Sequence, residues 1–474
     1  MPDTPLSTHQ KALRVNLDDR VHGTFAEIGA GQEVARWFFH VGAAANTVAK
    51  AISAYDMAVS DAIYGPSDRY VSRSRLSAML DREYSLLLER LAASHGANTS
   101  FFVFADTVAT RRFGTRDNGR GWMGVRFQSS PGAEPSEILL HVATCDPETQ
   151  REQEAIGVLG VNLLYGAVYL RETPAALVES LMDHLTRDRI EVDMIRFQGP
   201  AFAAVDNRVM SLHLVEHGLT DAAMFNADGD TVEVADVLHK QAVLVERGRF
   251  QPVTRLTIDL LEQALAQMTA EPELANADPP LQPVVLTEMT LRDLRSGPGI
   301  DKRDFLARAD LLRRLGRTVI VSNHGAYYEL AEHLARCTDQ PIGIALGVPA
   351  LAAIFDERYY DTLPGRLLEA AGRLFRHNVR LYLYPRLDRA TGAVVTADTL
   401  RVPSNIQHLY AHLRQNRYVV PIESFDRTCL GIDPDDVLRL IAAGDPRWEQ
   451  QVPPEIADTI RNEHLFGCID SREA

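Results

Sequence analysis

From residue 186 onward the sequence alternates short apolar segments with helix-like segments, and this alternation limits the fold more than any other feature. Segments such as RIEVDMIRF, AVLVERG, TVIVSN and VRLYLYP are rich in branched and aromatic residues, and stretches with helical apolar spacing separate them. Strands that alternate with helices predict a parallel sheet with crossover helices. We therefore expect Rossmann-like, mostly parallel α/β units in this part of the chain.

The N-terminal part of the chain, residues 1–185, has a different pattern. Helices are predicted over residues 33–63, 73–93 and 150–170, each from apolar residues that recur on one helical face. Between the last two helices, the segments SFFVFADTVA, GWMGVRFQ and SEILLHVAT are separated by polar turns. Three closely spaced strands of this kind predict an antiparallel meander. The fold class is thus α/β, with an N-terminal α+β domain.

A chain of 474 residues is long enough for two or three domains. We predict an α+β domain over residues 1–185, an α/β unit over 186–270, and a doubly wound α/β domain with a C-terminal helical tail over 284–474. The proline-rich, acidic segment TAEPELANADPPLQP is the best linker candidate. Whether the two α/β stretches share one sheet stays open at this point.

The charge balance argues against nucleic-acid binding. The net charge is -15, only four of the 49 basic residues are lysines, and no dense basic run contains interleaved aromatic residues. A small phosphorylated ligand remains compatible, because a focused arginine pocket can overrule the net charge locally.

Cysteines and apolar segments indicate the compartment. The four cysteines form no C-x-x-C pair, which fits a reducing compartment and offers no zinc site. The N-terminus lacks an apolar signal segment, and the longest uncharged apolar stretch, residues 155–170, is shorter than the roughly 20 residues that span a bilayer. We expect a cytoplasmic protein with no membrane segment, and no motif predicts a metal site.

Two glycines precede an apolar run in the stretch HGTFAEIGAGQEVARWFF. Gly29 and Gly31 do not complete a dinucleotide fingerprint, because Val34 stands where the third glycine belongs, and no Gly-Lys-Ser/Thr follows. What remains is a helix start whose free backbone N–H groups favour an anion. An ordinary capped helix start explains the same residues.

In open α/β sheets, ligands bind outside the carboxyl ends of the strands, so polar residues that follow strands are candidates. Ser322, Asn323 and His324 directly follow TVIV, and Gly347 follows PIGIAL. His324 can serve as a general acid or base, or as a cation for phosphate. If their strands are neighbours, Glu288 can converge with His324. The alternative is a Ser/Asn helix cap beside an exposed histidine.

Two other candidates lie in the middle of the chain. Asp193 interrupts the apolar strand IEVDMI, where a carboxylate is costly unless it meets an arginine, a cation or a ligand hydroxyl. Arg247 and Arg249 alternate after a strand, with Gly248 between them, and two guanidinium groups on one side suit a phosphate or a carboxylate. Alternate arginines on an exposed strand explain the second pattern equally well.

Several blocks spread over the chain, among them YDMAVSDAIYG, GVLGVNLLYGA, RIEVDMIRFQGP and LYLYP, resemble a bacterial family of similar length that occurs in cyanobacteria and other phyla. Some members carry the name nicotinate-nucleotide adenylyltransferase, which implies nucleotidyl transfer in NAD biosynthesis. Enzymes of that name use an H-x-G-H motif. Its nearest approximations here are His22-Gly23 and Asn323-His324-Gly325, so the resemblance transfers no catalytic residue.

Together these features predict a protein that binds a nucleotide or another phosphorylated metabolite. If it is an enzyme, a nucleotidyltransferase is the concrete version, with catalytic candidates His324, Glu288 and Asp193 and with Mg2+ brought by a nucleotide substrate. No complete catalytic signature is present, so a non-catalytic regulatory or interaction protein is the alternative. The cofactor is open, and a homo-oligomer is compatible with the sequence.

Overall fold

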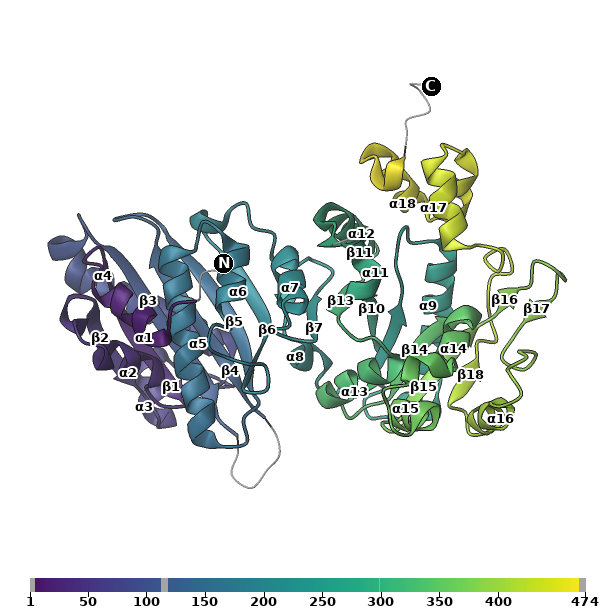
Figure 1. The fold of residues 1–474 in the computed structure, drawn as a ribbon, viewed down its shortest axis with the longest axis horizontal. Helices are drawn as coiled ribbons and strands as arrows, with labels where there is room; N and C mark the ends of the chain where they lie inside the picture. Colours follow the sequence, from purple (N-terminus) through teal and green to yellow (C-terminus); the bar gives the residue numbers. More distant parts are fainter. Residues whose placement is uncertain (1–4, 112–117, 298, 469–474) are drawn as a thin grey trace. The chain divides into compact units, whose positions relative to one another are not determined.

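The structure is a computed structural model in which residues 5–111, 118–297 and 299–468 are described. The chain divides into two compact units, Met1–Ala223 and Met224–Ala474, each with its own sheet (Figure 1). We call them unit 1 and unit 2. No helix in the described ranges has both the length and the apolar character needed to cross a lipid bilayer.

Unit 1 contains a six-stranded sheet in the order β2-β1-β3-β4-β5-β6. Its strands are β1 Val21–Gly29, β2 Val48–Ser53, β3 Ser100–Ala109, β4 Gly119–Gln128, β5 Pro135–Thr144 and β6 Ile190–Gln198. β1 pairs in parallel with β2 and β3, whereas the pairs from β3 to β6 are antiparallel. The predicted meander is therefore confirmed.

Helices pack on both faces of this sheet. They are α1 Thr8–Asn16, α2 Glu33–His40, η1 Ala44–Asn46, α3 Met57–Tyr64, α4 Arg73–His95, α5 Thr149–Tyr169, α6 Pro174–Ser180, η2 Pro200–Phe202 and α7 Asn207–Glu216. Alternate residues of β3 point to opposite faces. Phe101 and Val103 pack with Leu76 and Leu80 of α4, while Phe102 and Phe104 lie on the other face.

The predicted helix over residues 33–63 is wrong. FAEIG belongs to β1, α2 ends at His40, and residues 48–53 form β2 before α3 begins. Gly42 and Ala43 adopt positive φ values of 84° and 58°, a conformation that does not continue a right-handed helix. β2 then pairs with the outer edge of β1, and this tertiary pairing overrides the helical period of the sequence.

Unit 2 contains an eight-stranded sheet in the order β18-β15-β14-β9-β10-β13-β7-β8. Its strands are β7 Ala222–Phe225, β8 Thr231–Val232, β9 Val243–Arg247, β10 Val284–Thr290, β13 Thr318–Ser322, β14 Ile342–Gly347, β15 Val379–Tyr384 and β18 Val419–Pro421. The short pairs β11 Arg295–Ser296 with β12 Gly299–Ile300, and β16 Arg386–Leu387 with β17 Val394–Val395, are separate.

The helices of unit 2 connect these strands and extend beyond them. They are α8 Val234–Leu238, α9 Arg255–Thr269, α10 Pro272–Ala275, α11 Leu291–Leu294, α12 Lys302–Arg314, α13 Tyr327–Cys337, α14 Val348–Ile354, η3 Glu357–Tyr360, α15 Arg366–Leu374 and α16 Gln407–Gln415. The C-terminal part contains α17 Pro434–Ala442, η4 Pro446–Gln451, α18 Pro454–Asn462 and η5 Leu465–Gly467.

The order of the parallel strands in unit 2 is that of a Rossmann fold. If β9, β10, β13, β14, β15 and β18 are numbered one to six along the chain, their order in the sheet is 6-5-4-1-2-3, the doubly wound arrangement. The chain order reverses between β9 and β14. The predicted α/β fold with Rossmann-like units is confirmed.

The division of the chain differs from the predicted domain boundaries. β6, expected at the start of an α/β unit over 186–270, pairs with β5 in unit 1, and β7 to β9 join the same sheet as the later strands. The predicted linker, residues 269–283, contains α10 and the buried Leu274, and it completes the crossover from β9 to its neighbour β10. The composition of this segment therefore marks a connection between two neighbouring strands, and not a linker between two domains.

Candidate functional site

The carboxyl ends of β9, β10 and β13 in unit 2 adjoin a cavity of about 380 Å3. Its lining comes from the residues after β9, after β10 and after β13, and from α14, which follows β14. A doubly wound sheet has its ligand crevice where the strand order reverses, here between β9 and β14. Fold and cavity therefore indicate the same place independently.

A buried ion pair lies beside this cavity. Arg247 at the end of β9 donates from Nε to Glu288 Oε2 (2.7 Å) and from Nη2 to Glu288 Oε1 (3.1 Å). Ser322 Oγ donates to the same carboxylate at 2.5 Å. Glu288 is completely buried, and the Arg247 side chain is 10% exposed. The carboxylate thus orients Arg247, and its own oxygens already accept three hydrogen bonds.

The remaining lining divides into basic and aromatic parts. Arg249 and Arg292 are exposed at the cavity, and His324 lines it as a buried side chain. The rings of Tyr327 and Tyr359 are also part of the lining. The Arg247 guanidinium lies over the Tyr327 ring at 4.5 Å from its centroid, and Arg292 lies over Tyr359 at 5.9 Å. Burial raises the pKa of Tyr327 to about 12, so its phenol is neutral.

The other predicted residues of unit 2 have different places. Ser322 is buried and Asn323 is exposed, and both lie outside the cavity lining. Gly347 ends β14 and precedes the first residue of α14. β10 and β13 are neighbours, as convergence of Glu288 with His324 requires. Glu288, however, is bound by Arg247 and Ser322, which leaves it poorly placed to act as a base for His324.

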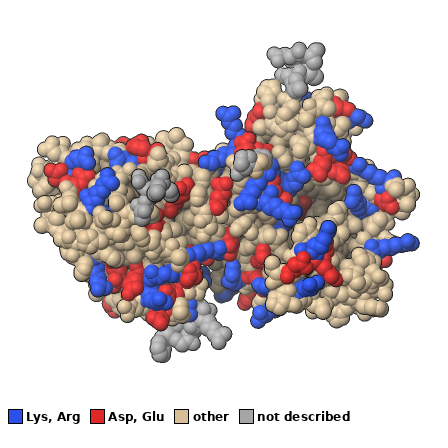
Figure 2. Space-filling view, in the orientation of Figure 1, with Lys and Arg blue, Asp and Glu red and all other residues tan. Residues whose placement is uncertain are grey.

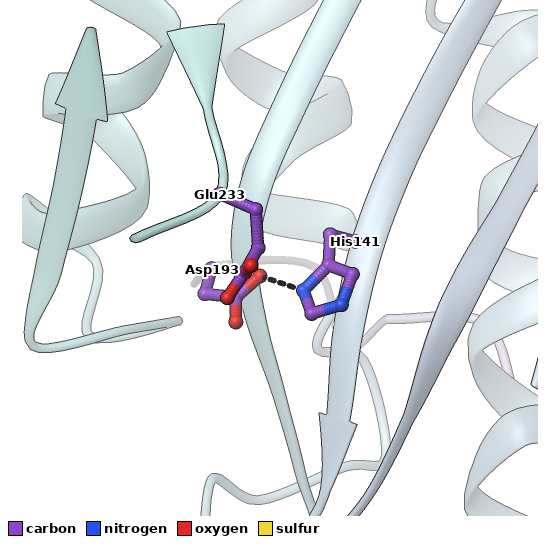
Figure 3. A group of neighbouring side chains, drawn as sticks. All are labelled: His141, Asp193 and Glu233. Carbon is purple, nitrogen blue, oxygen red and sulfur yellow. Dashed lines mark hydrogen bonds and ion pairs between the residues drawn. The ribbon is translucent and has the colours of Figure 1, made fainter. Parts of the chain in front are cut away.

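Asp193 belongs to unit 1 and not to the cavity of unit 2. The register between β5 and β6 passes from the pair His141–Met194 to the pair Val142–Val192, so Asp193 is the extra residue of a β-bulge. Its Oδ1 lies 2.7 Å from His141 Nδ1 (Figure 3). The partner of this carboxylate is thus a histidine, and not the arginine, cation or ligand hydroxyl that was expected from the sequence.

Gly29 and Gly31 also belong to unit 1. The backbone N–H groups of Val34 and Ala35 in the first turn of α2 donate to the buried carboxylate of Glu27, at 3.0 and 2.9 Å. The Glu27 side chain therefore already occupies this helix N-terminus. Gly29 and Gly31, both at positive φ, form the turn after β1 that places the first turn of α2 next to Glu27.

Some residues of the cavity were not found from the sequence. Arg292, Tyr327, Tyr359 and Tyr360 line it; Arg292 and Tyr327 follow the ends of β10 and β13 by a few residues, whereas the two other tyrosines do not follow a strand end closely. The tyrosine doublet begins twelve residues after β14, beyond α14. Strand-end reasoning finds only the first residues of each loop, so longer connections need the three-dimensional fold.

Comparisons with known proteins find only distant partial similarities. No protein-family model matches the chain, and no curated protein matches it. Similar solved structures include a competence/damage inducible protein CihA of Agrobacterium tumefaciens, with 15% identity, 35% of this chain and 97% of that chain covered, and a TM-score of 0.25. Another is nicotinic acid mononucleotide adenylyltransferase of Plasmodium falciparum, with 11% identity, coverage of 48% and 97%, and a TM-score of 0.29. At these values neither carries a functional argument.

Proposed function

We propose that unit 2 binds a nucleotide or a related phosphorylated metabolite in the cavity at the carboxyl ends of β9, β10 and β13. The observation that carries this proposal is the position of a cavity with arginine and tyrosine side chains at the strand-order reversal of a Rossmann-type sheet. The Arg247–Glu288 ion pair also supports the proposal, because Glu288 fixes the Arg247 side chain before any ligand arrives.

The two parts of the lining suit the two parts of a nucleotide. Arg249, Arg292 and His324 offer donors and positive charge for phosphate oxygens. Tyr327 and Tyr359 offer ring faces on which a base or a pyridine ring can stack. A cavity of about 380 Å3 falls within the usual range for small ligands.

Nucleotidyl transfer in NAD metabolism is the reaction that we propose for this site. Such transfer depends on positioning and charge stabilisation rather than on a covalent nucleophile. Arg249, Arg292 and His324 would hold the phosphates, and Mg2+ would arrive with the nucleotide. Acidic and basic side chains intermingle on the drawn face, without one broad basic surface, which favours a small phosphorylated ligand over nucleic acid (Figure 2).

Binding of ATP and of nicotinate mononucleotide, each with and without Mg2+, tests the proposal by calorimetry. Arg249→Ala with Arg292→Ala is expected to weaken the binding of at least one of these ligands by about a hundredfold, because each removes one charge-assisted phosphate contact. Both side chains are exposed, so the variant is expected to keep the stability of the parent protein.

The matched control is Arg447→Ala, which removes an exposed arginine of unit 2 that is outside the cavity lining. It is expected to leave both affinities unchanged. Equal affinities for the double variant and the control would overturn the assignment of the cavity. Release of pyrophosphate from ATP with the mononucleotide then separates an enzyme from a non-catalytic nucleotide-binding protein.

A further inference from the structure

A second depression in unit 2 lies at the other end of the sheet. It measures about 500 Å3, and we call it the amino-edge depression. Its lining residues are His239, Lys240, Ala335, Arg336, Cys337, Thr338, Asp339, His377 and Asn378. They come from the segments that precede β9, β14 and β15, three adjacent parallel strands. We propose that this depression binds a small polyvalent anion with two or more phosphate or carboxylate groups.

The three segments are joined to one another by hydrogen bonds. Thr338 Oγ1 donates to Gln241 O at 2.7 Å, and the amide of Val243 donates to Pro341 O at 3.1 Å. The amide of Ile342 donates to Asn378 O at 3.2 Å. These bonds hold the walls of the depression at the strand starts, so its side chains project from a fixed base and not from independent loops.

The lining is positively charged, in contrast to the acidic chain. Lys240 and Arg336 carry full positive charges, His239 and His377 add two imidazoles, and Asp339 is the single carboxylate among the described lining residues. Lys240 makes no ion pair or hydrogen bond within the described ranges. A local positive site in a protein of net charge -15 concentrates anions at one place on its surface.

Lys240 has a backbone conformation that is unusual for lysine. Lys240 adopts a φ of 57°, a conformation that glycine or asparagine adopts at lower cost. Asn378, also in the lining, has a φ of 52°. The chain therefore places a long cationic side chain where conformation alone favours a smaller residue, and strained positions of this kind concentrate at ligand sites.

The size and charge of the depression define the ligand class. A depression of about 500 Å3 accommodates a ligand of several anionic groups, and cations from two different segments suit a di- or triphosphate or a tricarboxylate better than a single phosphate. This site is separate from the proposed nucleotide site. α13 begins at Tyr327, which lines the nucleotide cavity, and ends at Cys337 in the amino-edge depression, about 15 Å away along the helix axis.

Calorimetric titration with inorganic tripolyphosphate tests the inference. All proteins in this experiment carry Arg249→Ala and Arg292→Ala, so that phosphate binding in the nucleotide cavity is weakened equally in all of them. Adding Lys240→Ala and Arg336→Ala is expected to weaken tripolyphosphate binding by about tenfold, because two cations near the ligand are lost. The matched control adds Lys302→Ala and Arg303→Ala, two exposed residues of α12 outside both linings.

The control keeps the same net charge as the test variant, so it separates a local site from general attraction. A tenfold loss in the test variant with an unchanged control supports the amino-edge site. Equal losses in both variants, no loss in either, or no tripolyphosphate binding to the parent would each overturn it. Retained nucleotide binding by Lys240→Ala, Arg336→Ala in an otherwise unchanged protein separates this result from the proposed function.

Discussion

Two buried carboxyl groups make the stability of unit 1 depend on pH. Glu27 of β1 and Asp106 of β3 are register partners on adjacent strands, and both are about 1% exposed. Burial raises the pKa of Glu27 to about 7, and burial together with the Glu27 charge raises the pKa of Asp106 well above its usual value. The folded chain therefore keeps protons that the unfolded chain releases.

We predict that unit 1 loses stability as the pH rises from about 4.5 to about 7, because in this window the folded state binds more protons than the unfolded state. Glu27→Gln cannot release a proton, so its stability is expected to fall less over the same window, by on the order of 2 kcal/mol. Urea unfolding followed by the fluorescence of Trp37 and Trp122, in a Trp448→Phe background, measures the difference.

A glutamate on the solvent side of α4 supplies the control for this experiment. Glu89 is exposed, and Glu89→Gln is expected to leave the pH profile of unit 1 unchanged. If Glu27→Gln showed the same profile as the parent protein, the proton would not be held at this pair.

At the residue scale, the sequence indicates which buried polar side chains need a hydrogen-bond partner, but it does not indicate which residues supply that partner. Asn162 and Tyr165 are polar residues in the apolar segment LGVNLLYGA, and buried polar groups require hydrogen bonds. Asn162 Oδ1 accepts from Lys11 Nζ at 2.8 Å, and Tyr165 OH accepts from Arg14 Nη1 at 2.7 Å. Both partners come from α1, about 150 positions earlier in the chain. No local pattern identifies a contact across that distance.

At the element scale, the Arg247–Glu288 pair joins β9 to β10. The two residues are register partners, and the amide of Gly248 also donates to Glu288 O at 3.0 Å. Glu288→Gln leaves the guanidinium buried without its counter-charge, so we predict a loss of about 3–5 kcal/mol in the free energy of unfolding of unit 2. Urea unfolding followed by Trp448, in a Trp37→Phe, Trp122→Phe background, measures this loss.

An exposed ion pair in unit 2 is the comparison for Glu288→Gln. Arg249 and Asp435 lie 2.8 Å apart with side chains that are 50% and 67% exposed, so Asp435→Asn is expected to cost less than about 1 kcal/mol. Arg247→Met with Glu288→Gln removes the unpaired charge and is expected to recover part of the lost stability. If Glu288→Gln and Asp435→Asn lowered the free energy of unfolding by similar amounts, the buried pair would not stabilise the contact between these strands.

Elements with strong periodicity were predictable, and elements that depend on pairing were not. The stripe Leu76, Leu80 and Leu87 predicted α4, and the strand β15 followed from VRLYLYP. By contrast, β2 lies within a stretch that was predicted as helix, and it is a strand because it pairs with the edge of β1. The register of a parallel edge strand depends on its partner, so it cannot be read from its own six residues.

At the scale of the whole molecule, alternation of strands and helices was enough to predict the α/β class but not the division of the chain. β6 is followed by α7 and β7 in the sequence, which is typical of one continuous α/β unit. In the structure β6 ends the sheet of unit 1 and β7 belongs to the sheet of unit 2. Sheet membership depends on which edge a strand joins, and alternation along the chain does not specify that edge.

This division predicts that each unit folds alone. Unit 1 has a core between α4 and its sheet, with Leu76 and Phe101, and unit 2 has one between α9 and its sheet, with Leu261 and Tyr382. A cut before Ala222 keeps β7 whole with unit 2. Fragments 1–221 and 222–474 are each expected to show a cooperative thermal transition.

Ligand binding by the fragments then tests where the nucleotide site is. All residues of the cavity and of the Arg247–Glu288 pair lie in fragment 222–474, so this fragment is expected to bind the nucleotide with an affinity within about threefold of the full chain. Fragment 1–221 serves as the control and is expected not to bind it. A folded fragment 222–474 that has lost the nucleotide would contradict a self-contained site, because its strand ends, arginines and tyrosines would all still be present.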